Sequence, residues 1–262
     1  MEMSQAPHRW PGRFFVGLGR ALYIGPAFDT TLHAHHAIQV CVALDRPFRL
    51  RCRPRASWSR YGGVVISSDQ PHELASSGHA VALFYVEPEG EDGRILSATP
   101  GAAVRLPGRL VAALRVMITD RVNTELDAAG ATNLFRDAME RLGLMVTARR
   151  PLDPRVAAAV RALRSARVAY PASCDLARTL GLSASRFRHL FDEQIGMSFR
   201  RYTLWLRLNA ALDEVLEGAS LTTAAHAAGF ADSAHLSRTF RRMFGIVPSA
   251  APQFTRLLPV VR

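Results

Sequence analysis

The stretch AGFADSAHLSRTFRRMFGIVPS, residues 228–249, reads as the end of one helix, a glycine turn and a second helix. Gly229 suits the turn, and Asp232 is placed to cap the helix that follows it. Gly245 then ends that helix, as glycine commonly does. Three apolar residues at helical spacing predict one buried stripe: Leu236, Phe240 and Met243. Together these features form the sequence pattern of a helix-turn-helix unit.

The same pattern occurs earlier, in LARTLGLSASRFRHLFDEQIGMSF, residues 176–199. Ala177 and Ala225 are the matching small residues at which two helices must approach closely. The buried stripe of this copy is expected to be Phe187, Leu190 and Phe191. The range 199–218 between the copies is long and periodic, and it predicts one helix that joins two helix-turn-helix units.

Caps and glycines define the helix ends of both copies. In the first copy we expect Ser173 and Ser183 to cap the two helices, and Gly181 and Gly196 to follow them. In the second copy Ser220 is the expected first cap.

The charge of the chain is strongly positive, and it is unevenly distributed. All 33 basic residues are arginine, and the net charge is +11. From Asp153 to the end there are 15 arginines against 8 acidic residues, a net of +7, whereas residues 1–152 carry 18 against 14, a net of +4. The more cationic C-terminal part suggests a polyanionic partner.

The outward faces of the second helices carry residues that suit DNA. A helix of this kind enters the major groove with its N-terminal residues at base edges, and arginine matches the acceptors of guanine. Five further arginines are placed for phosphate contacts: Arg186, Arg200, Arg201, Arg241 and Arg242.

Residues 153–250 resemble the C-terminal domain of AraC/XylS-type transcriptional regulators, in which a long helix joins two helix-turn-helix units. The turn, arginine, aromatic and Gly-x-x-Pro elements of residues 228–249 appear in register. The resemblance implies base contacts from the following residues: Ser185, Arg188 and His189 in the first unit, and Ser233, Ala234 and Arg238 in the second.

The first hundred residues read as strands. Ile38, Val40, Val42 and Leu44 alternate with Gln39, Cys41 and Ala43, and several short apolar runs end at turn residues. These features predict a barrel or sandwich. After about Leu106 the apolar period becomes helical over 106–122 and 132–148. These helices could pack on their own barrel or on a second copy of the chain. TARRPLDP, residues 147–154, is the expected boundary, because Asp153 and Pro154 signal a helix start.

Histidines cluster in LHAHHAIQV, residues 32–40. In a strand His33, His35 and Gln39 share one face and His36 lies on the other. His72 follows later, after the Gly62-Gly63 turn. This arrangement resembles a cupin barrel, although metal-binding cupins usually have glutamate at the position of Gln39.

Three interpretations of the cluster stay open. His33, His35 and His72 could hold a divalent metal, with help from Gln39 or Glu73. Alternatively, a small-molecule effector pocket could be lined by His33, His35, Gln39, Trp58, Tyr61 and His72. In the third interpretation the histidines are structural.

The sequence predicts an α+β chain of two domains. Residues 1–102 would form a cupin-like β-barrel sensor domain, 103–152 a helical connector and expected dimer contact, and 153–262 an AraC-type DNA-binding domain with two helix-turn-helix units. The expected function is a sequence-specific DNA-binding transcriptional regulator that senses a small-molecule effector, not an enzyme.

The expected partners are double-stranded DNA at a promoter, the effector, a second copy of the chain and, for an activator, RNA polymerase. No apolar run is long enough for a membrane helix, no signal peptide is evident, and Cys41, Cys52 and Cys174 lie far apart, so we expect a cytoplasmic protein. One alternative is a metal-dependent cupin oxygenase or isomerase with a helical appendage. Another is a basic nucleoid protein without sequence preference.

Overall fold

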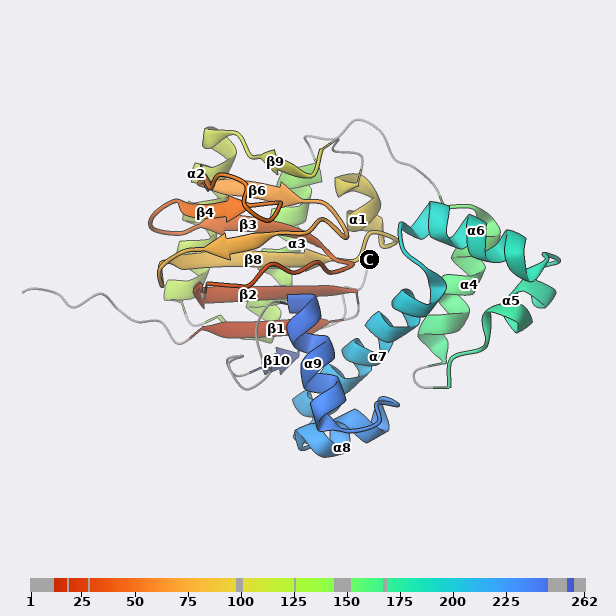
Figure 1. Cartoon of the computed structure of the whole chain (residues 1–262). Helices are drawn as coiled ribbons and strands as arrows, with labels where there is room; N and C mark the ends of the chain where they lie inside the picture. The colour runs from red at the N-terminus through yellow and green to blue at the C-terminus, as the bar shows by residue number, and fades with distance from the viewer. Residues whose placement is uncertain are drawn as a thin grey trace, which may run out of the picture.

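The chain consists of a sheet-rich N-terminal part and a helical C-terminal part (Figure 1). The computed structural model describes residues 12–17, 19–27, 29–97, 101–124, 126–143, 152–166, 169–244 and 254–256. Among these residues, no helix is both long and apolar enough to cross a lipid bilayer.

Two sheets make up the N-terminal part. The larger sheet has seven strands in the order β10 (Phe254–Arg256), β1 (Arg13–Gly17), β2 (Arg20–Pro26), β8 (Ala80–Val86), β3 (Ile38–Ala43), β6 (Gly63–Ile66) and β9 (Ala103–Arg105). The smaller sheet has the order β5 (Ser59–Tyr61), β4 (Phe48–Arg51) and β7 (Glu73–Ala75). Neighbouring strands are antiparallel, except that β1 pairs with β10 in parallel.

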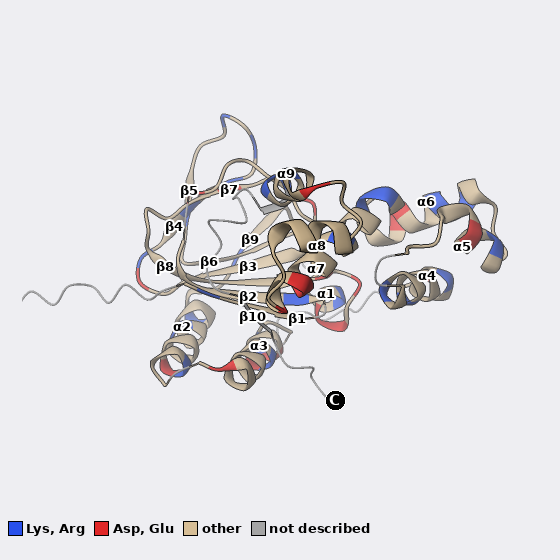
Figure 2. Ribbon diagram, turned by 90° about the horizontal axis from the view of Figure 1, so that it is seen from below, with Lys and Arg blue, Asp and Glu red and all other residues tan. Residues whose placement is uncertain are grey.

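The alternation expected in β3 is confirmed. Ile38, Val40 and Val42 pack against the helices α2 (Gly108–Asn123) and α3 (Ala128–Gly143). Cys41 and Ala43 belong to a second core that contains residues of the smaller sheet. The larger sheet therefore lies between the two helices on one face and the smaller sheet on the other (Figure 2). The expected barrel corresponds to these two facing sheets in the described part of the chain.

The expected connector helices are α2 and α3, and their apolar stripes pack on the sheet of the same chain. Leu114 and Ile118 of α2 are buried, as are Leu134, Phe135 and Leu142 of α3. A short helix, α1 (Glu91–Leu96), precedes them after β8.

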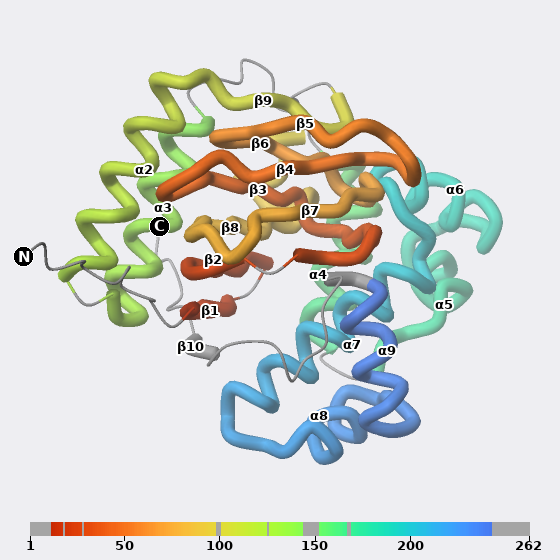
Figure 3. Tube along the Cα trace, turned by 60° about the vertical axis from the view of Figure 1, so that its left-hand side comes forward, coloured from red at the N-terminus to blue at the C-terminus, as the bar shows by residue number. Residues whose placement is uncertain are grey.

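The helical C-terminal part has its own core. Its helices are α4 (Pro154–Ser165), α5 (Ser173–Thr179), α6 (Ala184–Ile195), α7 (Phe199–Leu216), α8 (Leu221–Ala227) and α9 (Ser233–Phe244). The expected long central helix is confirmed as α7. The pairs α5/α6 and α8/α9 pack on α7, which also runs along one end of the sheets (Figure 3).

Most expected helix ends are confirmed. Asp153 caps α4, Ser183 caps α6 and Ser220 caps α8, each by accepting a backbone hydrogen bond. Asp232 accepts from the backbone N–H of His235 at 2.5 Å. The expectation for Ser173 is wrong, because Ser173 is the first helical residue and Ala172 occupies the cap without a side-chain bond.

The turn glycines adopt the left-handed backbone that favours glycine. The angle φ is +67° at Gly181, +82° at Gly196 and +76° at Gly229. Gly245, the expected end of the last helix, and the side chain of Met243, expected in its buried stripe, lie outside the described residues.

Candidate functional site

The outward face of α6 carries the residues expected to contact DNA from the first helix pair. Phe187, Leu190 and Phe191 are buried in the helical core. This stripe leaves four polar side chains exposed near the N-terminal end of α6: Ser185, Arg186, Arg188 and His189. The side chain of Ser183 accepts a hydrogen bond from the backbone N–H of Arg186. This cap fixes the conformation of the N-terminal turn of α6, here called its reading end, which carries the residues expected at bases.

The outward face of α9 has the same construction and different chemistry. Leu236 and Phe240 are buried. Ala234 and Arg238 are exposed, and Ser233 is half-buried. Arg238 is therefore the one long side chain among the three residues of α9 expected at bases, and the short Ser233 and Ala234 precede it.

The arginines expected at phosphates lie on the surface of the helical part. Arg200, Arg241 and Arg242 are exposed. Arg201 is also exposed, but its Nη2 lies 2.7 Å from Oδ1 of Asp69 in the sheet-rich part. In this arrangement Arg201 therefore forms an ion pair across the boundary between the two parts.

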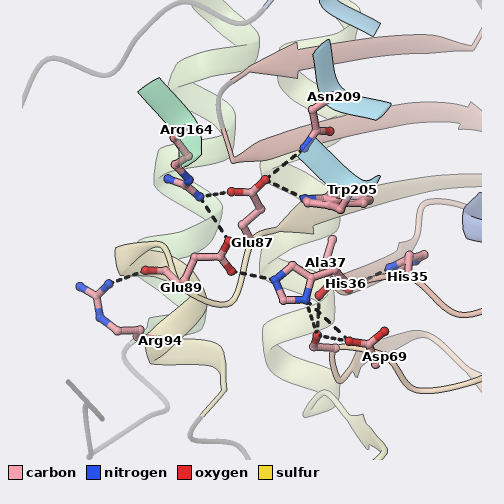
Figure 4. A network of polar contacts seen from close by, with 11 residues as sticks. His35, His36, Ala37, Asp69, Glu87, Glu89, Arg94, Arg164, Trp205 and Asn209 are labelled. Carbon is pink, nitrogen blue, oxygen red and sulfur yellow. Dashed lines mark hydrogen bonds and ion pairs between the residues drawn. The ribbon is translucent and has the colours of Figure 1, made fainter. Parts of the chain in front are cut away.

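A buried carboxylate joins the sheet-rich part to two helices of the helical part. Glu87, at the end of β8, accepts hydrogen bonds from Trp205 Nε1 at 2.8 Å and Asn209 Nδ2 at 3.2 Å, both on α7. Arg164 of α4 pairs with its other oxygen, as Figure 4 shows. One side chain, 3% exposed, thus holds α4 and α7 against the sheet.

His36 forms the second buried contact of this boundary. Its Nε2 lies 2.8 Å from Oε2 of Glu89, and its Nδ1 lies 3.7 Å from Oδ2 of Asp69 (Figure 4). Burial opposes the charged imidazole, but the two carboxylates outweigh it and raise the pKa of His36 to about 8. His36 also packs edge-on against the rings of Tyr202 and Trp205 of α7.

The expected cluster of His33, His35 and His72 is assembled. All three are buried, and one ligand atom from each lies within 4.8 Å of the others. Strand pairing brings the two segments together, since His33 and His72 form an isolated bridge. Burial lowers the pKa of His35 to about 4, with help from the neighbouring His33. Burial also lowers the pKa of His33 and His72, so the three rings are neutral near pH 7.

A backbone carbonyl orients each ring. The Nδ1 atoms lie 2.7 Å from Thr31 O, 2.9 Å from Ala37 O and 2.8 Å from Gln70 O for His33, His35 and His72, respectively. A carbonyl only accepts, so each Nδ1 carries the hydrogen and each Nε2 keeps its lone pair. This is the orientation that histidine metal ligands commonly have.

Gln39 completes the cluster. Its Oε1 lies 2.9 Å from Nε2 of His35 and 3.1 Å from Nε2 of His72, and its amide nitrogen lies 3.2 Å from Cys41 Sγ. The Gln39 oxygen and the two Nε2 lone pairs are all acceptors, so no hydrogen lies between them as they stand. Two arrangements would remove this repulsion. A cation could bind among them, or the amide could turn, so that its N–H groups donate to the rings and its oxygen accepts from Cys41.

The other residues expected in an effector pocket have contacts elsewhere. The Arg49 and Arg51 guanidiniums lie 5.5 Å and 4.7 Å from the ring centroid of Trp58. Tyr61 stacks on Phe48 and lies under Arg105. Trp58 is therefore stacked with two arginines of the smaller sheet, and Tyr61 packs against the core between the two sheets.

No sequence pattern predicted the boundary residues Glu87, Glu89 and Asp69. Glu87 and Glu89 share one short connecting segment, and Asp69 lies in another. The one available signal was the sequence VEPE, residues 86–89, which places two carboxylates directly after a buried strand.

Comparison with known proteins agrees with this geometry. Residues 176–252 match a family described as a helix-turn-helix domain. The resemblance to AraC/XylS-type regulators is thereby confirmed for this region, and the chain is a DNA-binding transcription regulator of the AraC type.

The whole fold is similar to that of ToxT from Vibrio cholerae. An apo variant from strain SCE256 is 10% identical with a TM-score of 0.58, and the match covers 88% of this chain and 96% of that chain. ToxT from strain O395 is 14% identical with a TM-score of 0.56, covering 88% and 95%. Wild-type ToxT with a bound unsaturated fatty acid is 12% identical with a TM-score of 0.54, covering 90% and 94%. The comparison with curated proteins gave no match.

Proposed function

We propose that this regulator reads a specific DNA site by placing α6 and α9 in neighbouring major-groove segments. A small molecule bound at the sheet-rich part would alter how the two helices are presented. The observation that carries the first part is the exposed reading end of α6, where Arg188 and His189 project from a helix fixed by its buried stripe. Arg188 would contact a guanine and Ser185 a neighbouring base, while Arg186, Arg200, Arg241 and Arg242 would contact phosphates.

Selection of genomic fragments by the purified full chain tests this function. We expect a few fragments that share two short elements about 10 bp apart, on one side of the duplex. Excess nonspecific DNA and physiological salt should be present, because nonspecific binding falls steeply with salt. Recovery of all fragments alike would instead indicate a basic protein without sequence preference.

The boundary between the two parts supports a site for the effector. A cavity of about 410 Å³ lies there. Ile38, Ser68 and Arg94 line it from the sheet-rich part, and Gln194 and Ile195 from the end of α6. A ligand in this cavity would touch both parts, so its affinity would differ between docked and undocked arrangements, as coupling requires. The lining combines apolar side chains with serines, Glu193 and one cation, Arg94. Arg94 would pair with the head group of an amphipathic carboxylate, the class of the fatty acid in the ToxT structure.

Oleic acid is a direct probe of this cavity. We expect saturable binding by the full chain and a changed affinity for the selected DNA. Arg94→Gln should weaken oleate binding, whereas Arg141→Gln on the far side of α3 should not. Equal binding by both variants would place the effector elsewhere.

The Glu87 contact should control docking. Glu87→Gln removes the closer of the two carboxylates that Arg164 pairs with and leaves only Glu89 Oε1, at 3.6 Å. Docking should weaken by about 1–3 kcal/mol, because Arg164 is partly exposed. We expect a red shift of Trp205 fluorescence and an altered DNA affinity. Glu140→Gln, an exposed change on α3, is the matched control. Unchanged fluorescence and DNA binding in Glu87→Gln would contradict a role of docking in regulation.

Metal binding by the histidine cluster is a second candidate function, favoured by the convergence of Nε2 atoms and Gln39 Oε1. Neutral imidazoles and an amide oxygen suit a borderline divalent ion such as Zn²⁺. Such an ion would link the segment before β3, which carries His33 and His35, to His72, which directly precedes β7. We expect one equivalent of zinc to bind and raise the melting temperature, with loss of both effects in His72→Ala. Absence of binding would favour the turned amide, with the histidines as structural residues.

A second copy of the chain is a further expected partner. Val116 of α2 is 61% exposed, on the opposite side from the buried Leu114 and Ile118. Contact between the α2 helices of two copies would cover this residue, in line with the dimer contact expected for the connector helices. Sedimentation of the wild type and Val116→Asp at micromolar concentration tests this contact. RNA polymerase becomes a partner where the chain activates transcription.

A further inference from the structure

The hairpin between β4 and β5 is strongly basic, and DNA reading by α6 and α9 does not account for it. Residues 46–60 contain six arginines and no acidic residue. They are Arg46, Arg49, Arg51, Arg53, Arg55 and Arg60. All except Arg51 are exposed.

The register of the hairpin places like charges together. Phe48 and Leu50 point into the core between the sheets, so the alternate residues of β4 point outward. Arg49 and Arg60 are direct cross-strand partners on that outward face. Like charges in directly opposed positions destabilise a sheet. An anion bound over this pair would therefore reduce the repulsion between Arg49 and Arg60.

Carboxylates on the protein itself do not neutralise this charge. Arg51 pairs with Glu73 at 2.5 Å. Within the described part of the chain, Arg49, Arg53, Arg55 and Arg60 have no ion pair. The ring of Trp58 instead lies beneath Arg49 and Arg51, which holds these guanidiniums in place without neutralising them.

The loop that joins β4 to β5 also exposes arginines. Arg55 has φ of +62°, a left-handed conformation that glycine or asparagine would adopt more easily. An arginine here is exposed at the end of the loop, beside Arg53.

The position of this surface fits the DNA-reading helices. The smaller sheet, α6 and α9 lie on the same side of the molecule, opposite α2 and α3 (Figure 2). In Figure 1 β4 and α9 lie toward the viewer, in front of α2 and α3. A duplex held on this side could therefore reach the hairpin.

We infer that Arg49, Arg53, Arg55 and Arg60, here called the hairpin basic face, bind phosphates of the DNA duplex outside the segment read by α6 and α9. This inference rests on the proposed DNA binding. Exposed, unpaired guanidiniums suit phosphates, and they contribute affinity without base preference. The sheet-rich part would thus add directly to DNA affinity besides holding the effector.

The test compares two triple variants of the full chain on a selected DNA site. Arg49→Gln, Arg55→Gln and Arg60→Gln together remove three charges from the hairpin basic face. Arg109→Gln, Arg136→Gln and Arg141→Gln remove three from α2 and α3 on the opposite side. Melting temperatures and sedimentation establish that both triples are folded and in the same oligomeric state. Each protein is titrated with a short duplex that spans only the two read elements, and with one extended by about 20 bp on each side.

For the hairpin triple on the long duplex, the slope of log affinity against log salt should become less steep by up to about 3, because each phosphate contact contributes about 0.9. The affinity at physiological salt should fall by about 10-fold or more, while the preferred sequence stays the same. The short duplex and the α2/α3 triple should show little change. An unchanged salt slope and affinity of the hairpin triple on the long duplex would overturn the inference and leave the proposed function intact. The hairpin basic face would then suit another anionic partner, such as an acidic protein. Failure of the wild type to select any site would overturn both.

Discussion

The helix pairs α5/α6 and α8/α9 share their inner construction and differ on their outer faces. Both place alanine at the helix crossing, glycine with positive φ in the turn, and an oxygen cap at the start of the second helix. Phe187 and Phe191 in α6 correspond to Leu236 and Phe240 in α9, and all are buried. Outward, α6 carries Arg186, Arg188 and His189, whereas α9 begins with Ser233 and Ala234. The shared residues maintain the fold, and the different residues determine what each helix can read.

The largest expected effect concerns the shared interior. Phe187→Ala should lower the free energy of unfolding by about 3–5 kcal/mol, because it leaves a cavity beside two aromatic rings. Phe240→Ala should fall at the lower end of that range, since α6 packs on α4, α5 and α7 and α9 packs on α7 and α8. Urea unfolding followed by circular dichroism measures both. A larger loss from Phe240→Ala would show that the second pair bears more of the stability.

The next effect separates the outer faces. Arg188→Ala should weaken specific DNA binding by about 1–3 kcal/mol and relax the preference at one base position. Arg238→Ala should also weaken DNA binding, but with a smaller change in base preference. The reason is that the short side chains of Ser233 and Ala234 leave α9 with few direct base contacts. Affinities for a panel of single-base variants of the site measure this. Uniform weakening across the panel for Arg188→Ala would make Arg188 a phosphate contact.

The smallest effect distinguishes the two caps. Ser183→Ala and Asp232→Ala should each lower stability by about 1 kcal/mol, since each frees a backbone N–H at a helix start. Only the Asp232→Ala loss should shrink as salt is added, because a carboxylate also interacts with the helix dipole. Melts at low and high salt test the difference. Equal salt dependence would mean that hydrogen bonding alone accounts for both caps.

Local and repeated features were predictable from the sequence. The long helix α7, the caps at Ser183 and Asp232 and the alternation in β3 all depend on neighbouring residues, so their spacing reveals them. Ser173 was misjudged because Ala172 can occupy a cap without any side-chain bond, leaving a serine at the first helical position.

Contacts between distant segments were less predictable. The histidine cluster could be anticipated, because resemblance to a known barrel related His33 and His35 to His72. No such pattern related Glu87 to Trp205 or Asp69 to Arg201, since each pair is defined only when the two parts dock. Trp58 could not be placed, because an aromatic residue before a strand suits a pocket wall and an arginine stack equally well.

The pairing of β10 with β1 bears on how the chain is made. Phe14 lies opposite Phe254 in this register, so the first described strand is completed by the last. During synthesis the sheet-rich part therefore emerges with β1 as an open edge, which is a template for pairing with other chains. A chain that ends before residue 254 would keep that edge open permanently, and its sheet-rich part should aggregate more readily than the full chain.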